Sequence, residues 1–235
     1  MEFIKQKHKI IDIDENALQL IEFAGRTCYD SRHKITLDSS EKFVNNLIKN
    51  QHTAMIEFAS MTVLFVTDRS VTHELVRHRL CSFAQQSQRY IRYKGDIQFI
   101  LPPWFPDEYI GVWKDDKDSQ KWLEFENIRN KFIFENKTTD NAPFPKTHQD
   151  YILGCMRTEK LYQSLIEHGW APEKARKKLS NDVATEIVIK TNFREWIHIF
   201  NLRQKGTTGR PDPTIKQLLT PLLEEIIEKY EVVFS

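Results

Sequence analysis

The segment HELVRHRLCSFAQQSQRYIRY, residues 73–93, constrains the fold more than any other part of the sequence. No acidic residue lies between Glu74 and Asp96, and uncharged hydrogen-bonding side chains fill the interval. Its cationic or potentially cationic side chains include Arg77, His78, Arg79, Arg89 and Arg92. A solvated basic helix face normally carries interspersed acids, so this run predicts a binding site for an anion.

The overall charge supports a local site rather than a basic coat. The 235-residue chain has 34 basic and 33 acidic residues, so its formal net charge is only +1. A general nucleic-acid binder usually carries a basic excess over its whole domain. We therefore predict no nucleic-acid partner, although the interleaved aromatics and cations of RYIRYK, residues 89–94, leave a single-strand binding module as an alternative.

Length and hydropathy predict a folded protein with no membrane partner. A hydrophobic content of 40% over 235 residues can supply a proper core. No apolar run approaches the roughly 20 residues of a membrane span. The first residues, MEFIKQKHKIID, lack the apolar stretch of a secretory signal, so the expected location is cytoplasmic.

The three cysteines predict neither disulfides nor a metal site. Cys28, Cys81 and Cys155 are widely separated and form no C-x-x-C pair. We interpret them as buried free thiols and predict no bound metal.

Apolar periodicity predicts an α+β protein. The predicted helices are 10–31 with an end near Gly25, 39–53, 71–80, 151–169, 171–179, 181–205 and 212–230. A short β-branched run predicts a buried strand at 61–68, and alternation predicts a strand at 89–104 that a Pro-Pro pair ends. Asp68 or Ser70 is the expected N-cap of the helix that follows the first strand.

Residues 114–150 read as an excursion from this arrangement. Trp122, Phe125, Ile128 and Phe132 recur at helical spacing in a charged background. This stripe predicts ordinary packing rather than a cofactor contact.

Glycine usage decides how a phosphate would be bound. The chain has only seven glycines, and none forms a glycine-rich phosphate loop. Arginine side chains must then hold any phosphate, and several in one pocket suit a nucleotide or dinucleotide. The serine and glutamine run at 82–88 can supply donors and acceptors to a flat heterocycle.

A second polar group of residues lies far along the chain. Asn192, Trp196, Ile199 and Arg203 fall on one face of a predicted helix, and the nearby Arg194 and His198 form an i, i+4 pair. The stripe could face a nucleotide pocket. Equally, Arg194 and His198 could be surface residues paired with Glu195 or other acids.

The quoted motifs resemble those of the flavin-dependent thymidylate synthases. RHRLCSFAQQS, residues 77–87, is similar to that family's signature of Arg-His-Arg, seven residues and Ser, and QRY continues it. QHTAMIEF at 51–58 resembles an upstream segment, and the block at 174–203 resembles the C-terminal one. Ser180 and Ala54 depart from residues common in the family.

The resemblance implies two sets of ligand-binding residues. FAD is expected at His52, Ala54, Arg77, His78, Arg79, Gln85, Asn192, Arg194 and His198. Deoxyuridine monophosphate (dUMP) is expected at Glu74, Arg77, Gln85, Gln86, Ser87, Gln88, Arg89, Arg176 and Arg203. Arg203 is the expected catalytic residue, lying against the uracil ring.

The resemblance also implies the reaction. In this family dUMP becomes thymidine monophosphate (dTMP), with 5,10-methylenetetrahydrofolate as carbon donor and NADPH-reduced FAD as reductant, without an enzyme nucleophile. The sequence is consistent with that, because neither Cys81 nor Ser87 has a recognisable base. A flavoprotein of another reaction remains an alternative, which would lose uracil binding.

The implied architecture is one α+β domain over residues 1–235, with an atypical excursion around 106–150. It has a small mixed sheet flanked by helices and a helical C-terminal half. The implied assembly is a homotetramer whose flavin sites are shared between subunits.

Overall fold

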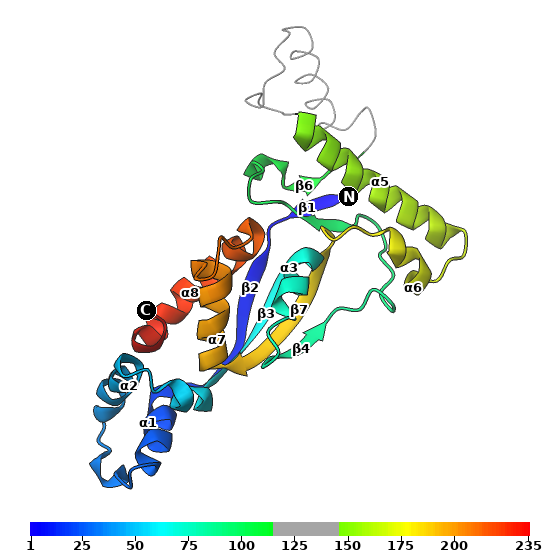
Figure 1. Ribbon diagram of the computed structural model, residues 1–235. Coiled ribbons are helices and arrows are strands. Elements are labelled where there is room, and N and C mark those ends of the chain that lie inside the picture. Colours follow the sequence, from blue (N-terminus) through cyan, green and yellow to red (C-terminus); the bar gives the residue numbers. More distant parts are fainter. Residues whose placement is uncertain (115–145) are drawn as a thin grey trace, which may run out of the picture. The chain divides into compact units, whose positions relative to one another are not determined.

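The computed structural model describes residues 1–114 and 146–235 (Figure 1). The predicted stripe from Trp122 to Phe132, and most of the excursion at 106–150, lie outside the described residues. Contacts divide the chain into two compact units, and the single-domain interpretation stays a prediction. The first unit is Met1–Gln6, Asp68–Ser70 and Gln86–Thr185, and the second is Lys7–Thr67, Val71–Gln85 and Glu186–Ser235.

The first unit contains a three-stranded sheet in the order β5-β1-β6. Its strands are β1 (Glu2–Ile4), β5 (Gln98–Ile100) and β6 (Gly111–Val112). β1 runs parallel to β5, which places Phe3 opposite Phe99, and antiparallel to β6. A 3₁₀ turn, Asp107–Tyr109, precedes β6.

The first unit also contains α5 (Lys146–Glu167), α6 (Pro172–Ala175) and a 3₁₀ turn, Arg176–Lys178. α5 buries Ile152, Met156 and Tyr162 in the same cluster as Phe3 and Phe99. The helix therefore covers the apolar side of its sheet.

The second unit is built on a four-stranded sheet in the order β2-β3-β7-β4 (Figure 1). The strands are β2 (Lys7–Ile13), β3 (Ser60–Asp68), β4 (Ser82–Gln85) and β7 (Ala184–Asn192). β2 pairs antiparallel with β3, and β4 antiparallel with β7. Met61, Val63 and Phe65 of β3 are fully buried while the residues between them are half-buried, as strand alternation requires.

The second unit also contains helices that share an apolar core with this sheet. They are α1 (Ala17–Thr27), α2 (Ser39–Lys49), α3 (Arg69–Leu75), α7 (Phe193–Phe200) and α8 (Pro213–Phe234), with 3₁₀ turns at Arg32–Lys34 and Thr53–Phe58. α8 packs against α2, α7 and β2. Asp212 caps α8 by accepting hydrogen bonds from the N–H groups of Thr214 and Ile215 at 2.8 and 3.2 Å.

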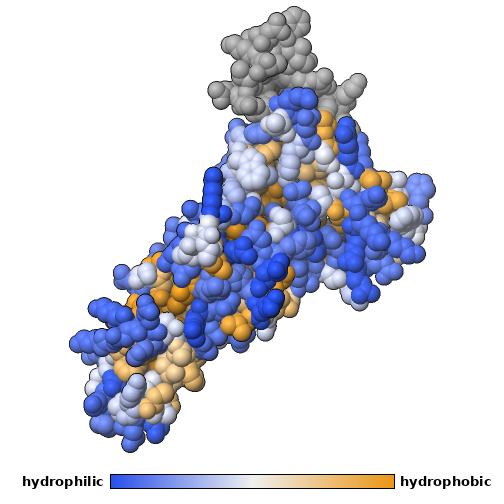
Figure 2. All heavy atoms as spheres, viewed as in Figure 1, coloured by the Kyte–Doolittle hydropathy of each residue, from blue (hydrophilic) through white to orange (hydrophobic). Residues whose placement is uncertain are grey.

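The surface is mostly hydrophilic on the face drawn in Figure 2, with apolar patches between the polar side chains. Such scattered exposure is normal for a folded protein. Among residues 1–114 and 146–235, no helix combines the length and the apolar character that crossing a membrane requires.

The α+β class, the small sheets and the helical C-terminal half are confirmed. The strands divide between two sheets. The predicted strand at 61–68 and the predicted helices at 39–53, 151–169 and 212–230 also match the structure closely.

The predicted helix at 181–205 is wrong in its first half, where Ala184–Asn192 forms β7. Ile187 and Ile189 are fully buried and Lys190 is exposed, so the run follows the period of two of a strand. The β-branched residues of ATEIVIKTN favour that conformation. The predicted helix from residue 10 is likewise wrong as far as Ile13, where β2 ends.

Two further boundaries differ. The helix predicted at 71–80 begins at Arg69 and ends at Leu75, so the Arg-His-Arg motif leaves it for a tight turn. Of the strand predicted at 89–104, only Gln98–Ile100 is extended and paired. Cationic side chains are interleaved with apolar ones through 89–94. This pattern resembles the alternation of a strand, but these residues do not form one.

Candidate active site

The Arg-His-Arg motif lies in the turn between α3 and β4. The His78 N–H donates to the Leu75 carbonyl at 3.1 Å, and the Cys81 N–H donates to the His78 carbonyl at 3.2 Å. These turns bury His78, which is 5% exposed, and leave Arg77 and Arg79 at the surface. The three residues of the motif therefore have different environments despite their adjacency.

His78 is held from both sides of its ring. Its Nδ1 lies 3.2 Å from Oε1 of Glu195, and its Nε2 lies 3.4 Å from Nε of Arg203. The ring of His198 meets it edge-on, with 5.6 Å between the ring centroids. Residues far apart in the sequence thus converge on one imidazole.

These contacts determine the tautomer of His78. A guanidinium can only donate, so Nε2 must accept the hydrogen bond from Arg203, and Nδ1–H then donates to the Glu195 carboxylate. Burial lowers the pKa of His78 below its ordinary value of 6.5, with Arg203 and His198 acting in the same direction and Glu195 opposing them. The ring is neutral at pH 7.

Arg203 lies in a π-helix, Asn201–Lys205, that continues α7. Its Nη1 donates to Oε2 of Glu74 at 2.5 Å, so its guanidinium contacts a carboxylate and an imidazole together. The predicted common face with Trp196 and Ile199 is wrong, because those two side chains are buried in the core whereas Arg203 is partly exposed. The wider π turn advances each residue less around the axis and so changes the direction of Arg203.

Asn192 and Arg194 have local partners in the structure. Asn192 is the N-cap of α7, and its Oδ1 accepts from the Glu195 N–H at 2.9 Å. Arg194 pairs with Glu57 at 2.5 Å, and both side chains are about half exposed. Pairing of Arg194 with an acid at the surface is therefore observed, and its alternative role at a nucleotide pocket stays a prediction.

A pocket of about 480 Å³ lies beside these residues. It is lined by Thr53, Glu57, Leu80, Asn192, Arg194, Glu195, Ile197, His198 and Asn201. Its volume is in the range of small-molecule sites. The structure therefore brings three residues of the predicted FAD set, Asn192, Arg194 and His198, around one cavity.

Three further residues of the predicted FAD set, His52, Ala54 and Gln85, belong to other elements of the second unit. His52 is exposed and precedes the 3₁₀ turn Thr53–Phe58 that includes Ala54. Gln85 ends β4, and its Nε2 donates to Oγ1 of Thr72 at 3.0 Å.

Sequence reasoning named Glu195 only as a possible surface partner of Arg194 and His198, and missed its buried contact with His78. Asn192 and Glu195 have the i, i+3 spacing of a capping box, which signals that Glu195 begins a helix. Glu57, five residues after His52 in the quoted QHTAMIEF segment, belonged to the resemblance but was given no role.

The predicted dUMP residues of the first unit form a turn and part of a short helix. Ser87 accepts from the Arg89 N–H at 3.3 Å, and the Arg89 guanidinium lies 5.5 Å from the centre of the Tyr90 ring. Gln88 is buried, and among the described residues its side-chain Nε2 has no hydrogen-bond partner. A buried amide of this kind suits a ligand contact. Gln86 lies beside Ser87, and Arg176 begins the 3₁₀ turn Arg176–Lys178.

The cysteines differ in burial. Cys28 is exposed, which corrects the interpretation of three buried thiols, and Cys155 is buried. Burial raises the pKa of Cys81 to about 11 and that of Cys155 to about 12. Both are therefore protonated at neutral pH and are poor nucleophiles.

The site offers possible ligands to a cation. Donor atoms of His78, Glu195 and His198 all lie within 4.8 Å of one another. The Arg203 guanidinium, however, already donates to Nε2 of His78 and repels a cation there. The geometry fits an anionic or neutral polar ligand better.

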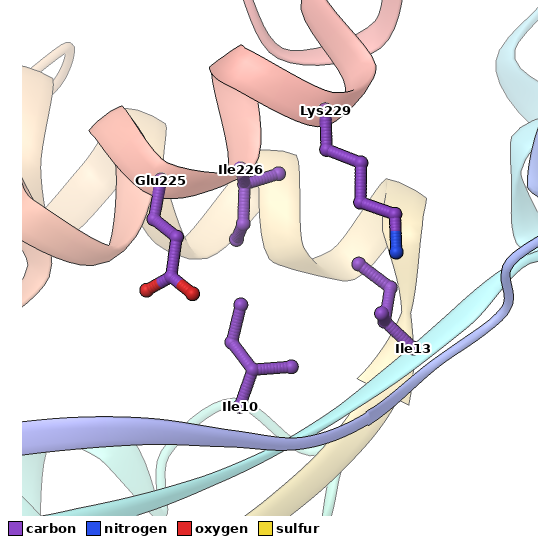
Figure 3. A pocket seen from close by; sticks show the side chains of 5 residues that line it. All are labelled: Ile10, Ile13, Glu225, Ile226 and Lys229. Atoms are coloured by element: carbon purple, nitrogen blue, oxygen red, sulfur yellow. The ribbon is translucent and has the colours of Figure 1, made fainter.

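A smaller pocket of about 230 Å³ lies between β2 and α8, lined by Ile10, Ile13, Glu225, Ile226 and Lys229 (Figure 3). The pairing of β2 with β3 shifts register between Ile10 and Asp12, which turns Ile10 and Ile13 toward the same helix. Glu225 also pairs with His8 at 2.8 Å. This pocket contains none of the predicted site residues.

Known proteins with similar sequences share one description. The family model "Thymidylate synthase complementing protein" matches residues 9–230. A flavin-dependent thymidylate synthase from Corynebacterium diphtheriae is 30% identical over 219 residues, covering 92% of this chain and 77% of that protein. One from Mycobacterium leprae is 28% identical, covering 92% and 78%.

A solved structure shows the same fold. The UMP/dUMP methylase PolB from Streptomyces cacaoi, bound with 5-Br dUMP, superposes with a TM-score of 0.68. The match covers 99% of this chain and 96% of that one at 18% sequence identity.

Proposed function

Because the chain belongs to the family of flavin-dependent thymidylate synthases, we propose that it methylates dUMP to dTMP with FAD as its flavin. The observation that carries this proposal is the fixed guanidinium of Arg203, held by Glu74 and His78 beside a pocket lined by Asn192, Arg194 and His198.

The residues of the 480 Å³ pocket fit part of a flavin dinucleotide. Arg194 supplies a cation for a phosphate, the Asn192 and His198 side chains supply polar contacts, and Leu80 and Ile197 supply apolar surface for a ring. We also assign His52, Ala54, Arg77, His78, Arg79 and Gln85 to FAD. The flavin, when bound, supplies the reducing equivalents of the reaction.

We assign dUMP to two groups of residues. The first group is Glu74, Arg77, Gln85 and Arg203, and the second is Gln86, Ser87, Gln88, Arg89 and Arg176. The arginines suit the phosphate because a guanidinium matches it with two parallel hydrogen bonds. The unpaired amide of Gln88 suits a polar edge of the sugar or base.

Arg203 is the proposed catalytic residue. Methylation at C5 of uracil requires that C5 become more reactive. The electron redistribution that makes it so places negative charge on the N3 and carbonyl edge of the ring. A guanidinium whose position is already fixed stabilises that charge without reorganising during the reaction. Such an interaction is stronger in the transition state than in the ground state and therefore raises turnover.

We propose that no enzyme nucleophile takes part, that 5,10-methylenetetrahydrofolate donates the carbon and that NADPH reduces the flavin. The raised pKa values of Cys81 and Cys155 support the first point, because a protonated thiol does not add to the ring. We also propose a cytoplasmic homotetramer with flavin sites shared between subunits.

Purified protein tests these assignments directly. We expect a flavin absorbance spectrum that dUMP perturbs, and dTMP formation that requires both methylenetetrahydrofolate and NADPH. A colourless protein that forms no dTMP after addition of FAD would refute the proposal. Salt-dependent binding of single-stranded DNA by such a protein would favour the nucleic-acid alternative.

Dissociation of the assembly tests the shared flavin site. Monomers separated by mild denaturant should lose FAD in proportion to the loss of tetramer, as followed by light scattering and flavin absorbance. Monomers that keep stoichiometric FAD and turn over would contradict sharing.

A further inference from the structure

We propose that Glu195 is a positioning residue that holds Arg203 in place through His78. The inference rests on the proposed function of Arg203, and it assigns a role to a buried carboxylate that the motif residues do not include. Glu195 itself is not expected to contact the uracil ring.

The location of Glu195 restricts its carboxylate. The residue lies in the first turn of α7, where the Asn192 side chain caps its N–H at 2.9 Å. It is only 7% exposed, and its Oε1 lies 3.2 Å from Nδ1 of His78. A carboxylate near a helix N-terminus is also stabilised by the helix dipole. Its position and charge are therefore fixed without a ligand.

The contacts form a directed chain from Glu195 to Glu74. Nδ1–H of His78 donates to Glu195, Nε–H of Arg203 donates to Nε2 of His78, and Nη1–H of Arg203 donates to Glu74. The first bond determines which nitrogen of His78 is the acceptor. Without Glu195, the proton can move to Nε2, and two donors would then face each other between His78 and Arg203.

Two substitutions separate hydrogen bonding from charge. Gln in Glu195→Gln keeps an acceptor for Nδ1–H, so it should keep the tautomer while removing the negative charge. Glu195→Ala removes both. We expect Glu195→Ala to lower kcat by about 10- to 100-fold, by analogy with the loss of a partner that orients a metal-bound imidazole. The KM for dUMP should change much less, and Glu195→Gln should fall between wild type and Glu195→Ala.

The pH dependence of kcat separates a positioning role of Glu195 from a role in packing alone, because loss of packing would not shift the profile. The charged and titratable groups that face His78 are Glu195 and His198 from α7 and Arg203 from the π-helix. Protonation of His78 removes the acceptor for Arg203, so activity should fall on the acid side as His78 titrates. Glu195 raises the pKa of His78. Glu195→Gln should therefore lower that pKa and move the acid limb of kcat to lower pH.

The control is Glu22→Gln, an equally buried carboxylate of α1 outside the site. It should leave kcat and the acid limb unchanged.

The tautomer of His78 can be read independently by nitrogen NMR of the histidine rings: wild type and Glu195→Gln should show the Nδ1–H form, and Glu195→Ala should lose it. This measurement needs no activity, so it distinguishes failure of the inference from failure of the proposed reaction.

The outcomes divide as follows. A shifted acid limb in Glu195→Gln with the Nδ1–H form retained supports the positioning role. Wild-type kcat in folded, flavin-bound Glu195→Gln and Glu195→Ala, an unmoved acid limb, or an Nε2–H form of His78 in the wild-type protein would overturn it. If Glu195→Ala does not fold, Glu195→Gln and the wild-type spectrum decide alone.

Discussion

Two buried carboxylates of the second unit, Glu22 and Glu195, have similar burial and different surroundings. Glu22, 1% exposed, accepts from Nε of Arg26 at 2.6 Å and from Oγ of Ser39 at 2.9 Å. Glu195, 7% exposed, accepts from His78, a ring whose pKa burial lowers below its ordinary value of 6.5. The first carboxylate joins α1 to the start of α2, and the second controls an imidazole beside a pocket.

The comparison teaches that burial alone does not distinguish a structural acid from a functional one. Both carboxylates accept hydrogen bonds, as a buried charge requires. The difference lies in the partner: Glu22 accepts from a guanidinium and a hydroxyl, whereas Glu195 accepts from an imidazole that also contacts Arg203. Substitutions near Glu195 should therefore change turnover, and those near Glu22 should change stability.

The largest effect should come from Arg203→Ala. Loss of the fixed guanidinium should lower turnover by about 10²- to 10³-fold, equivalent to about 2.7 to 4 kcal/mol. Flavin content should stay near that of the wild-type protein, and Arg203→Lys should restore only part of the rate because a point charge lacks the planar fork. Single-turnover dTMP formation and thermal unfolding should be measured on the same sample. A near-wild-type rate with reduced stability would make Arg203 a structural residue and remove the contrast.

Glu22→Ala should produce the opposite pattern. It leaves the guanidinium of Arg26 without its carboxylate in a site where that side chain is 13% exposed. We expect the free energy of unfolding to fall by about 2 kcal/mol, because a mostly buried charge loses its partner. Urea denaturation measures the change. Turnover per folded, flavin-bound molecule should not change, and a large loss of kcat would contradict the division between the two carboxylates.

Replacement of the thiols by serine should give smaller effects that follow burial. Cys155→Ser should lower stability by about 1 kcal/mol and Cys28→Ser should have almost no effect, because Cys155 is buried and Cys28 is exposed. Cys81→Ser should keep dTMP formation, since the pKa of Cys81 is raised to about 11. Complete loss of activity in a folded, flavin-bound Cys81→Ser protein would establish a covalent mechanism instead.

The last effect concerns stability at acid pH. The pKa of His78 is lower in the folded chain than its ordinary 6.5, so the unfolded chain binds more protons as the pH falls below that value. Stability should therefore decrease from pH 6.5 downward, by at most about 1.4 kcal/mol per pH unit for one proton. His78→Asn should make this slope shallower in urea titrations at several pH values. His148, whose pKa is also lowered by burial, should account for part of the slope that remains.

Sequence patterns predicted the elements that have one strong period. The amphipathic α2 and the apolar alternation of β3 are local signals, and both are confirmed. β7 was missed because its apolar residues run directly into those of α7, so the change of period at Asn192 is hidden. Asn192 caps α7 and so marks the boundary between β7 and α7. An asparagine alone does not identify a helix start, however, unless a strand is already expected before it.

The sequence predicted which residues belong to the candidate site, but it did not predict which of them contact one another. The Arg-His-Arg motif, Asn192, Arg194 and Arg203 were found from sequence, and their assigned ligands remain predictions. The contact between His78 and Glu195 joins residues 117 positions apart, and that between Glu74 and Arg203 joins residues 129 apart. Such pairings depend on the packing of α7 beside the turn after α3, which no local pattern in a single sequence records.

The π-helix at Asn201–Lys205 places a constraint on chain length as well as on residue type. The wide turn of a π-helix contains more residues than a turn of a regular α-helix. Gly206 ends the π-helix in a left-handed conformation, with φ of 75°. Deleting one residue between Phe200 and Arg203 would leave every motif residue present and still rotate Arg203 by about 100° around the helix axis. We therefore expect this segment to tolerate substitution more readily than shortening, because an insertion or deletion there changes the direction of Arg203.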